Sequence, residues 1–87
     1  MTYTVRFTFQ ARKTIDKLDR QVAFIIMGWI QKNLVDCEDP RAKGKGLVGD
    51  HSGEWRYRVG DYRIIVDIRD TELIILFIAV GHRNNIY

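Results

Sequence analysis

The chain has 87 residues, of which 46% are hydrophobic and 29% are charged, and its formal net charge is +3. This length suits one domain, residues 1–87, with a single core. The longest apolar run, Leu73 to Val80, is too short to span a bilayer, so we expect no membrane segment. Cys37 has no second cysteine to pair with, and the N-terminus lacks the layout of a signal peptide, so a cytoplasmic protein is expected.

The first part of the chain predicts a strand and then a short helix. Apolar and polar residues alternate over residues 2–9, which indicates a strand with one wet face. The side expected to be buried comprises Tyr3, Val5, Phe7 and Phe9. From Gln10 the period changes, and Ala11, Ile15 and Leu18 have the spacing of an amphipathic helix.

A second helix is expected after Asp19, whose carboxylate suits the N-cap position. Its main apolar stripe comprises Val22, Ile25, Ile26, Trp29, Ile30 and Leu34. Phe24 and Met27 lie off this stripe. They either widen the contact with the core or form a partly exposed pair of the kind that a partner protein binds. Pro40 indicates that the helix has ended.

Residues 36–53 show no periodicity and are expected to form a long loop. Lys43 and Lys45 alternate with glycines, which would let the backbone approach a phosphate while lysine supplies charge. The spacing is not that of a nucleotide-binding loop, so this signal is weak. Leu47 and Val48 are expected to pin the loop to the core.

The most distinctive stretch runs from Gly53 to Arg63 and reads Gly-Glu-Trp-Arg-Tyr-Arg-Val-Gly-Asp-Tyr-Arg. Strict alternation predicts a strand with Arg56 and Arg58 on one face. The opposite, core-facing side comprises Trp55, Tyr57 and Val59.

Gly60-Asp61 suits a two-residue hairpin turn. The pairs expected across this hairpin are Val59 with Tyr62, Arg58 with Arg63, and Tyr57 with Ile64. Like charges opposite each other destabilise a sheet, so the pairing of Arg58 with Arg63 indicates a place for an anionic ligand.

Two further strands complete the predicted sheet. Ile64, Val66 and Ile68 continue the buried face, and a turn is expected at Asp70-Thr71. Residues 73–80 are apolar throughout, which predicts a central strand covered on both faces. The order β-α-α-β-β-β predicts an α+β fold, an antiparallel sheet with a two-helix hairpin packed on one face.

Clustered arginines on one sheet face suit a phosphodiester, because the planar guanidinium offers paired donors and keeps its charge. Tyr62 and Tyr87 are better placed than the core-facing aromatics to stack on a base. If RNA is cleaved, its own 2′-hydroxyl would be the nucleophile, while the protein positions the backbone, neutralises charge and moves protons. His82 is either a proton-transfer group or a strand-end residue that fixes the C-terminal turn. No cluster has metal-ligand spacing, so neither a metal nor another cofactor is expected.

Gly53 to Ile65, the apolar strand that follows, and Val80-Gly81-His82-Arg83 with Tyr87 close behind resemble the RelE family of the RelE/ParE toxin superfamily. The resemblance covers nearly the full chain. It implies the toxin of a type II toxin-antitoxin system, a ribosome-dependent, metal-independent endoribonuclease that cleaves mRNA in the A site. The implied partners are a RelB-like cognate antitoxin, the ribosome and mRNA, with operator DNA bound only through the antitoxin.

The same resemblance assigns roles to residues. Arg63 and Arg83 match arginines that orient and stabilise the scissile phosphate, and Tyr87 matches a tyrosine that stacks on or activates the nucleotide. The predicted catalytic residues are therefore Arg58, Arg63, His82, Arg83 and Tyr87, and the predicted substrate-binding residues are Lys43, Lys45, Arg56 and Tyr62. Tyr87 follows Arg83 by a shorter gap than in the best-known member. Arginine at 56 and 58 keeps phosphate binding but disfavours a general base there.

Two other functions fit the superfamily. One is a ParE-like toxin that inhibits a topoisomerase and cleaves no RNA, because a shared fold does not fix function. The other is an inactive module that retains only antitoxin binding and operator co-repression. Antitoxin binding is expected at the Phe24 and Met27 region or at the outer sheet edge.

Overall fold

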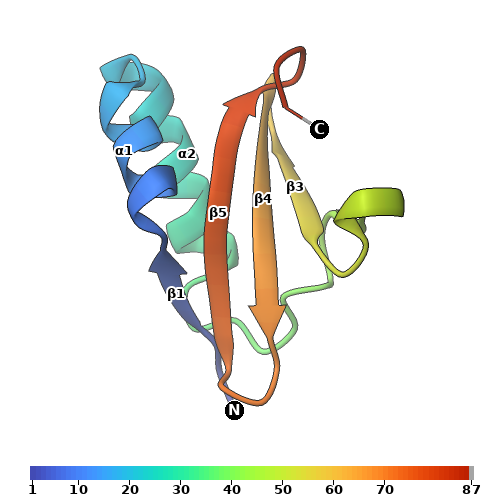
Figure 1. The fold of residues 1–87 in the computed structure, drawn as a ribbon. Coiled ribbons are helices and arrows are strands. Elements are labelled where there is room, and N and C mark those ends of the chain that lie inside the picture. Colours follow the sequence, from blue (N-terminus) through green and yellow to red (C-terminus); the bar gives the residue numbers. More distant parts are fainter. Residues whose placement is uncertain (87) are drawn as a thin grey trace.

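Two helices cover one face of a five-stranded sheet in the computed structural model, which describes residues 1–86 (Figure 1). Along the chain the elements are β1 (Thr4–Phe7), α1 (Phe9–Lys17), α2 (Arg20–Asn33), β2 (Lys45–Gly46), the 3-10 helix η1 (Gly49–His51), β3 (Trp55–Val59), β4 (Tyr62–Arg69) and β5 (Ile74–His82). The strand order is β1-β5-β4-β3-β2. The described pairs are antiparallel except β1 with β5, which is parallel. The predicted α+β class is confirmed.

Residues 36–53 contain more structure than expected. Lys45 and Gly46 form β2, which pairs with Arg56 and Trp55 of β3, and η1 follows. Leu47 is half-buried, and its amide donates to the carbonyl oxygen of Glu54 at 3.0 Å. Val48 is 85% exposed, so the prediction that it pins this loop to the core was wrong. So short a strand has no periodicity of its own, and its partner strand defines it.

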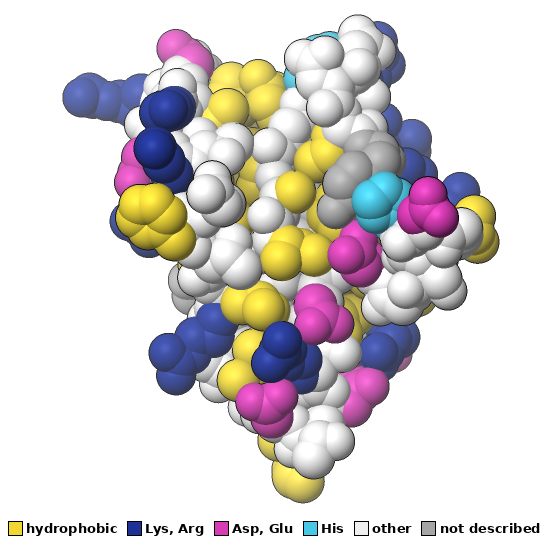
Figure 2. All heavy atoms as spheres, viewed as in Figure 1, with side chains coloured by type: hydrophobic (Ala, Val, Ile, Leu, Met, Phe, Trp, Pro, Cys, Tyr) yellow, Lys and Arg dark blue, Asp and Glu magenta, His cyan; other side chains and the backbone are white. Residues whose placement is uncertain are grey.

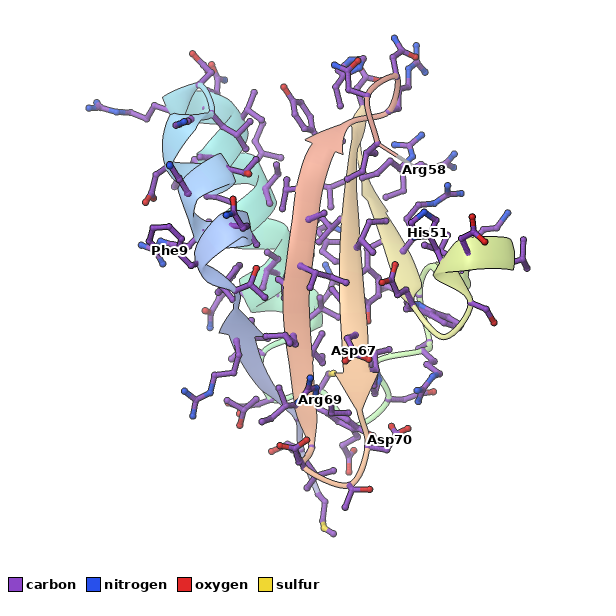
Figure 3. All side chains as sticks on the ribbon, viewed as in Figure 1. Phe9, His51, Arg58, Asp67, Arg69 and Asp70 are labelled. Atoms are coloured by element: carbon purple, nitrogen blue, oxygen red, sulfur yellow. The ribbon has the colours of Figure 1, made fainter. Side chains whose placement is uncertain are left out.

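The first strand is shorter than predicted because Thr8 begins a helix. Its side-chain oxygen accepts from the amide of Ala11 at 3.1 Å, which caps α1, so β1 ends at Phe7. Phe9, expected on the buried side of the strand, instead lies on α1 and is 77% exposed (Figure 3). The predicted N-cap of α2 is confirmed, since the Asp19 carboxylate accepts from the amide of Gln21 at 3.1 Å.

The core lies between the helices and the sheet. Its members include Ala11, Ile15, Ile26, Ile30, Tyr57, Ile64, Val66 and Phe77. Ile25 was placed on the buried stripe of α2, but it is 55% exposed beside Phe24, which is 78% exposed. The buried residues of α2 are Ile26 and Ile30, and a neighbour one residue away from Ile26 is rotated outward.

β5 lies inside the sheet between β1 and β4, but the helices cover only one of its faces. Ile75, Phe77 and Val80 are buried, whereas Ile74 and Leu76 are only half-buried. The prediction of a strand covered on both faces was therefore wrong. Figure 2 shows hydrophobic side chains along the middle of the face turned to the viewer, together with acidic and basic side chains in its lower part. In residues 1–86 no helix is both long and apolar enough to cross a membrane.

Candidate functional site

The β3–β4 hairpin has the predicted register. Arg58 pairs with Arg63, Tyr57 with Ile64, and Val59 with Tyr62. Of the two turn residues, only Gly60 has a positive φ, 59°, which is the pattern of a type II′ turn and explains the glycine at this position. The hairpin therefore places two arginines directly opposite each other on the same face of the sheet.

A groove of about 530 Å³ lies along β3, and most of its lining is cationic. The lining residues are Trp29, Lys43, Gly44, Lys45, Arg56, Arg58 and Arg63. They come from α2, the chain entering β2, and the β3–β4 hairpin. No described aspartate or glutamate lines the groove. A cleft of this size suits a small ligand or part of a larger one, and its charge selects an anion.

Hydrogen bonds from β3 hold the wall that carries the two lysines. Trp55 Nε1 donates to the carbonyl oxygen of Lys43 at 2.7 Å. The Tyr57 hydroxyl donates to the carbonyl oxygen of Pro40. Burial raises the pKa of Tyr57, so this hydroxyl stays protonated and remains a donor. Trp55 and Tyr57 therefore face the core as predicted, and they also position the loop.

Gly44 is required where the loop meets β3. Its φ is 83°, which side chains rarely adopt, and a Cβ at this position would lie 2.3 Å from the carbonyl oxygen of Arg56. The close approach brings the loop backbone against the strand that carries the arginines. The two glycine-flanked lysines are thus built into the groove.

The arginines at this end of the sheet repel one another. Loss of hydration, followed by the positive charges of Arg58, Arg56 and Arg83, lowers the pKa of Arg63. A bound phosphate would reverse these repulsive interactions. The electrostatics therefore favour an anionic ligand over an empty site.

Neutral acceptors and one weak ion pair hold these arginines in the folded chain. The Arg63 guanidinium donates to the carbonyl oxygens of Gly60 at 3.0 Å and Tyr62 at 3.1 Å. Arg83 lies 3.8 Å from the Asp61 carboxylate, an exposed pair that adds little stability. Both side chains can change partner when an anion binds.

Tyr62 and His82 lie together and are not among the residues that line the groove. They pair across β4 and β5 with ring centroids 5.6 Å apart, and Tyr62 packs against the core. The Asn84 amide donates to His82 Nδ1 at 3.3 Å, a contact that fixes the turn after β5. Because Nδ1 accepts, the neutral imidazole carries its proton on Nε2. This contact is the one that the turn-fixing interpretation of His82 predicts.

The structure thus brings some of the predicted site residues together and leaves others apart. Those that share the groove are Lys43, Lys45, Arg56, Arg58 and Arg63. Arg83 does not line the groove, although its charge acts on Arg63. Tyr62 and His82 lie elsewhere, as described above, and Tyr87 is outside the described residues.

Sequence reasoning missed one groove residue, Trp29. Its helical spacing placed it on the apolar stripe of α2, and its ring does lie 5.4 Å from the Tyr57 ring. The indole is only half-buried, however, and it also lines the groove. The spacing of apolar residues along α2 does not show which of them will lie beside β3, because β3 comes later in the chain.

Comparison with known proteins identifies the family. Residues 5–87 match the family model described as ParE toxin of type II toxin-antitoxin system, parDE. The chain is a toxin of the RelE/ParE family. Toxin RelG of Mycobacterium tuberculosis is 32% identical over 87 residues, which are 100% of this chain and 98% of RelG. The predicted family is confirmed.

Solved toxin structures have the same fold. The M. tuberculosis RelBE2 toxin-antitoxin complex contains a chain with a TM-score of 0.85 and 29% identity, and the match covers 98% of this toxin and 95% of that chain. The isolated E. coli RelE toxin has a TM-score of 0.74 at 23% identity over 92% of this toxin and 83% of that chain, a likeness of fold. These matches confirm the predicted RelE-like architecture.

Proposed function

We propose that this RelE/ParE toxin is a metal-independent endoribonuclease that cleaves ribosome-bound mRNA in the cytoplasm and thereby inhibits translation. The observation that carries the proposal is the groove in which Arg58 and Arg63 face each other beside Arg56 and two lysines, with no described carboxylate in the lining. Guanidinium groups bind phosphate oxygens through two parallel hydrogen bonds, and RNA supplies a phosphate at every nucleotide.

The proposed reaction uses the substrate's own hydroxyl. The 2′-oxygen forms a bond to phosphorus while the bond from phosphorus to the 5′-oxygen breaks, leaving a 2′,3′-cyclic phosphate and a 5′-hydroxyl. Arg58, Arg63 and Arg83 neutralise the charge that grows on the non-bridging oxygens. The 2′-hydroxyl gives up one proton and the leaving 5′-oxygen gains one, and Tyr87 and His82 are the predicted carriers.

Arg83 tests the reaction and the site together. Primer extension on mRNA after induction is expected to show codon-periodic cuts for the wild type. Arg83→Ala should fold normally and lose cleavage by about 10²- to 10³-fold, the usual effect of removing one group that stabilises transition-state charge. Full cleavage by this variant would contradict the site. Absence of any cuts by the wild type would contradict the function.

We also propose that a RelB-like antitoxin neutralises this toxin, as in the RelBE2 complex. A second groove, of about 510 Å³, lies between α1 and α2 and includes Phe24 and Met27 with Arg12 and Arg20. Its exposed phenyl group suits the apolar face of an amphipathic antitoxin segment, whereas its charges are mixed, because Asp16 also lines the groove and pairs with Arg12 at 3.4 Å. Hydrogen exchange with and without the antitoxin should show new protection of α2. Unchanged protection there would remove this docking surface.

A second candidate function is supported by the family model, whose description names ParE. In that case the toxin would inhibit a topoisomerase by binding and would cleave no RNA. The order of events after induction separates the two functions. The nuclease predicts that translation stops before any DNA damage appears, and the ParE-like function predicts the reverse.

A further inference from the structure

We propose that Trp29 is a base-stacking platform for the RNA nucleotide next to the scissile phosphate, and that Lys43 and Lys45 hold that nucleotide's backbone. This subsite deepens the proposed function and rests on it. It assigns a ligand to the half of the groove that the three hairpin arginines do not form. The inference begins from the position of one indole among cations.

The indole is supported from behind. Trp29 lies near the C-terminal end of α2, and its ring is tilted by 52° against the Tyr57 ring at a centroid distance of 5.4 Å. Tyr57 is fully buried and its hydroxyl is bound to the Pro40 carbonyl, so this neighbour is fixed. Trp29 itself is half-buried and is one of the residues that line the groove. A ring held on one side and open on the other can stack on a base without first being ordered.

The other residues that line the groove suit the phosphate of a nucleotide. Beyond Trp29 and Gly44, every lining side chain carries a positive charge. A protein segment docking there would need many acidic side chains, because the indole is the one large apolar group it would meet. Single-stranded RNA instead offers both a phosphate and an unstacked base at each step. The chemistry therefore favours RNA as the occupant.

The geometry also places this subsite beside the reaction. β2 pairs with only Trp55 and Arg56, and no described strand lies beside the rest of that edge of β3. One groove is lined by Trp29 and the two lysines and also by Arg58 and Arg63. A nucleotide on Trp29 would thus be directly continuous with a phosphate at the arginine pair.

Intrinsic fluorescence tests the stacking directly, since the chain has two tryptophans, Trp29 and Trp55. A short single-stranded RNA made uncleavable by 2′-O-methyl groups is titrated into the wild type and into Trp29→Phe at low salt. We expect saturable quenching in the wild type and most of it lost in Trp29→Phe, where only Trp55 remains. The same sequence as a duplex should quench little, because its bases are already stacked.

Binding and turnover test the energetic role. Trp29→Ala should bind the uncleavable RNA about 5- to 150-fold more weakly, the range for removing one stacked base contact. Trp29→Phe should recover most of the affinity. On ribosome-bound mRNA, Trp29→Ala should raise KM with little change in kcat, because stacking acts equally on substrate and transition state. Phe9→Ala is the matched control, since Phe9 is 77% exposed on α1, outside the groove, and should change neither quantity.

The outcomes separate this inference from the proposed function. Cleavage by the wild type together with unchanged RNA binding in Trp29→Ala overturns the subsite and leaves the nuclease intact. Equal quenching by single-stranded and duplex RNA overturns stacking and reduces the groove to charge alone. Quenching by an antitoxin segment but not by RNA also overturns the subsite. Loss of stability in Trp29→Ala cannot imitate the expected result, because the fluorescence comparison uses Trp29→Phe.

Discussion

Arginines at the two ends of the sheet have opposite surroundings: one is paired with a carboxylate, and the others face one another. At the end near the β4–β5 turn, Arg41 donates two hydrogen bonds to the Asp70 carboxylate, at 2.9 Å and 3.1 Å, and the Tyr3 hydroxyl donates to the same carboxylate at 2.6 Å. At the other end Arg58 and Arg63 face each other, and no described carboxylate lines their groove. Figure 3 labels Arg58 near one end and Asp70 near the other.

The difference separates charges that are paired within the fold from charges that repel one another. Hydrogen bonds from Arg41 and then Tyr3 lower the pKa of Asp70, which is the mark of a carboxylate stabilised in its charged form. For Arg63, loss of hydration and neighbouring arginines lower the pKa instead, which means that the surroundings disfavour its positive charge. A pKa that is shifted because the surroundings disfavour the charged form is typical of functional sites.

The largest expected effect comes from removing the opposed pair. Arg58→Ala combined with Arg63→Ala should reduce cleavage by more than about 100-fold, because transition-state charge loses its stabilising groups. The free energy of unfolding should stay the same or rise, because repulsion is removed. Arg69→Ala is the control on the same strand, since Arg69 already pairs with Asp67 at 3.1 Å and should leave cleavage unchanged. A clear loss of stability in the double variant would contradict the comparison.

A smaller effect on cleavage is expected from the hydrogen bond between Tyr57 of β3 and Pro40 of the loop. Tyr57→Phe removes the donor to Pro40 and leaves a buried carbonyl without its partner, which should lower the free energy of unfolding by about 1–3 kcal/mol. Urea denaturation measures this change. Cleavage should fall as well, because the lysine-bearing loop loses an anchor. Wild-type stability in this variant would show that the loop is held by other contacts.

The paired end also predicts a pH dependence. Because the folded pKa of Asp70 is lowered from 3.8, its contribution to stability is fully present above that pH. The contribution is lost as the pH falls through the lowered folded value. Asp70→Asn should therefore reduce stability near neutral pH and flatten its loss below about pH 4. An unchanged acid profile in the variant would show that this carboxylate does not respond to its two donors.

The smallest effect concerns the loop lysines. Each of Lys43→Ala and Lys45→Ala should reduce the slope of log affinity against log salt for single-stranded RNA by roughly 0.7. Each variant loses one phosphate contact and keeps the fold, because both side chains are exposed. Fluorescence anisotropy at several salt concentrations measures the slopes. Identical slopes for variants and wild type would remove the lysines from the interface.

The hairpin could be predicted in full because its determinants are local. The two-residue turn at Gly60-Asp61 and strict alternation set the Arg58 to Arg63 pairing before any tertiary contact is known. Phe9 and Ile25 were misplaced for a different reason. A single cap at Thr8 ended the strand early, and the width of the helix contact depends on the sheet packed against it.

The groove was only partly predictable. Its arginines lie on one hairpin, so alternation alone brings them together. Trp29 and Lys43 meet them through hydrogen bonds and ring contacts that join separate elements, and no spacing in the sequence encodes those meetings. A local pattern thus finds the charges, and tertiary packing supplies the aromatic partner.

The parallel pairing of β1 with β5 determines when the sheet can be completed during folding. Thr4 lies beside Ile74 and Phe7 beside Phe77, so the first strand has no neighbour until the last strand exists. During synthesis β1 therefore cannot pair until β5 has been made, whereas α2 can already pack against Tyr57 of β3 through Trp29. Closing so long a loop late makes folding slow relative to a chain of local contacts. The sheet that displays Arg58 and Arg63 is therefore complete only when β1 and β5 have paired.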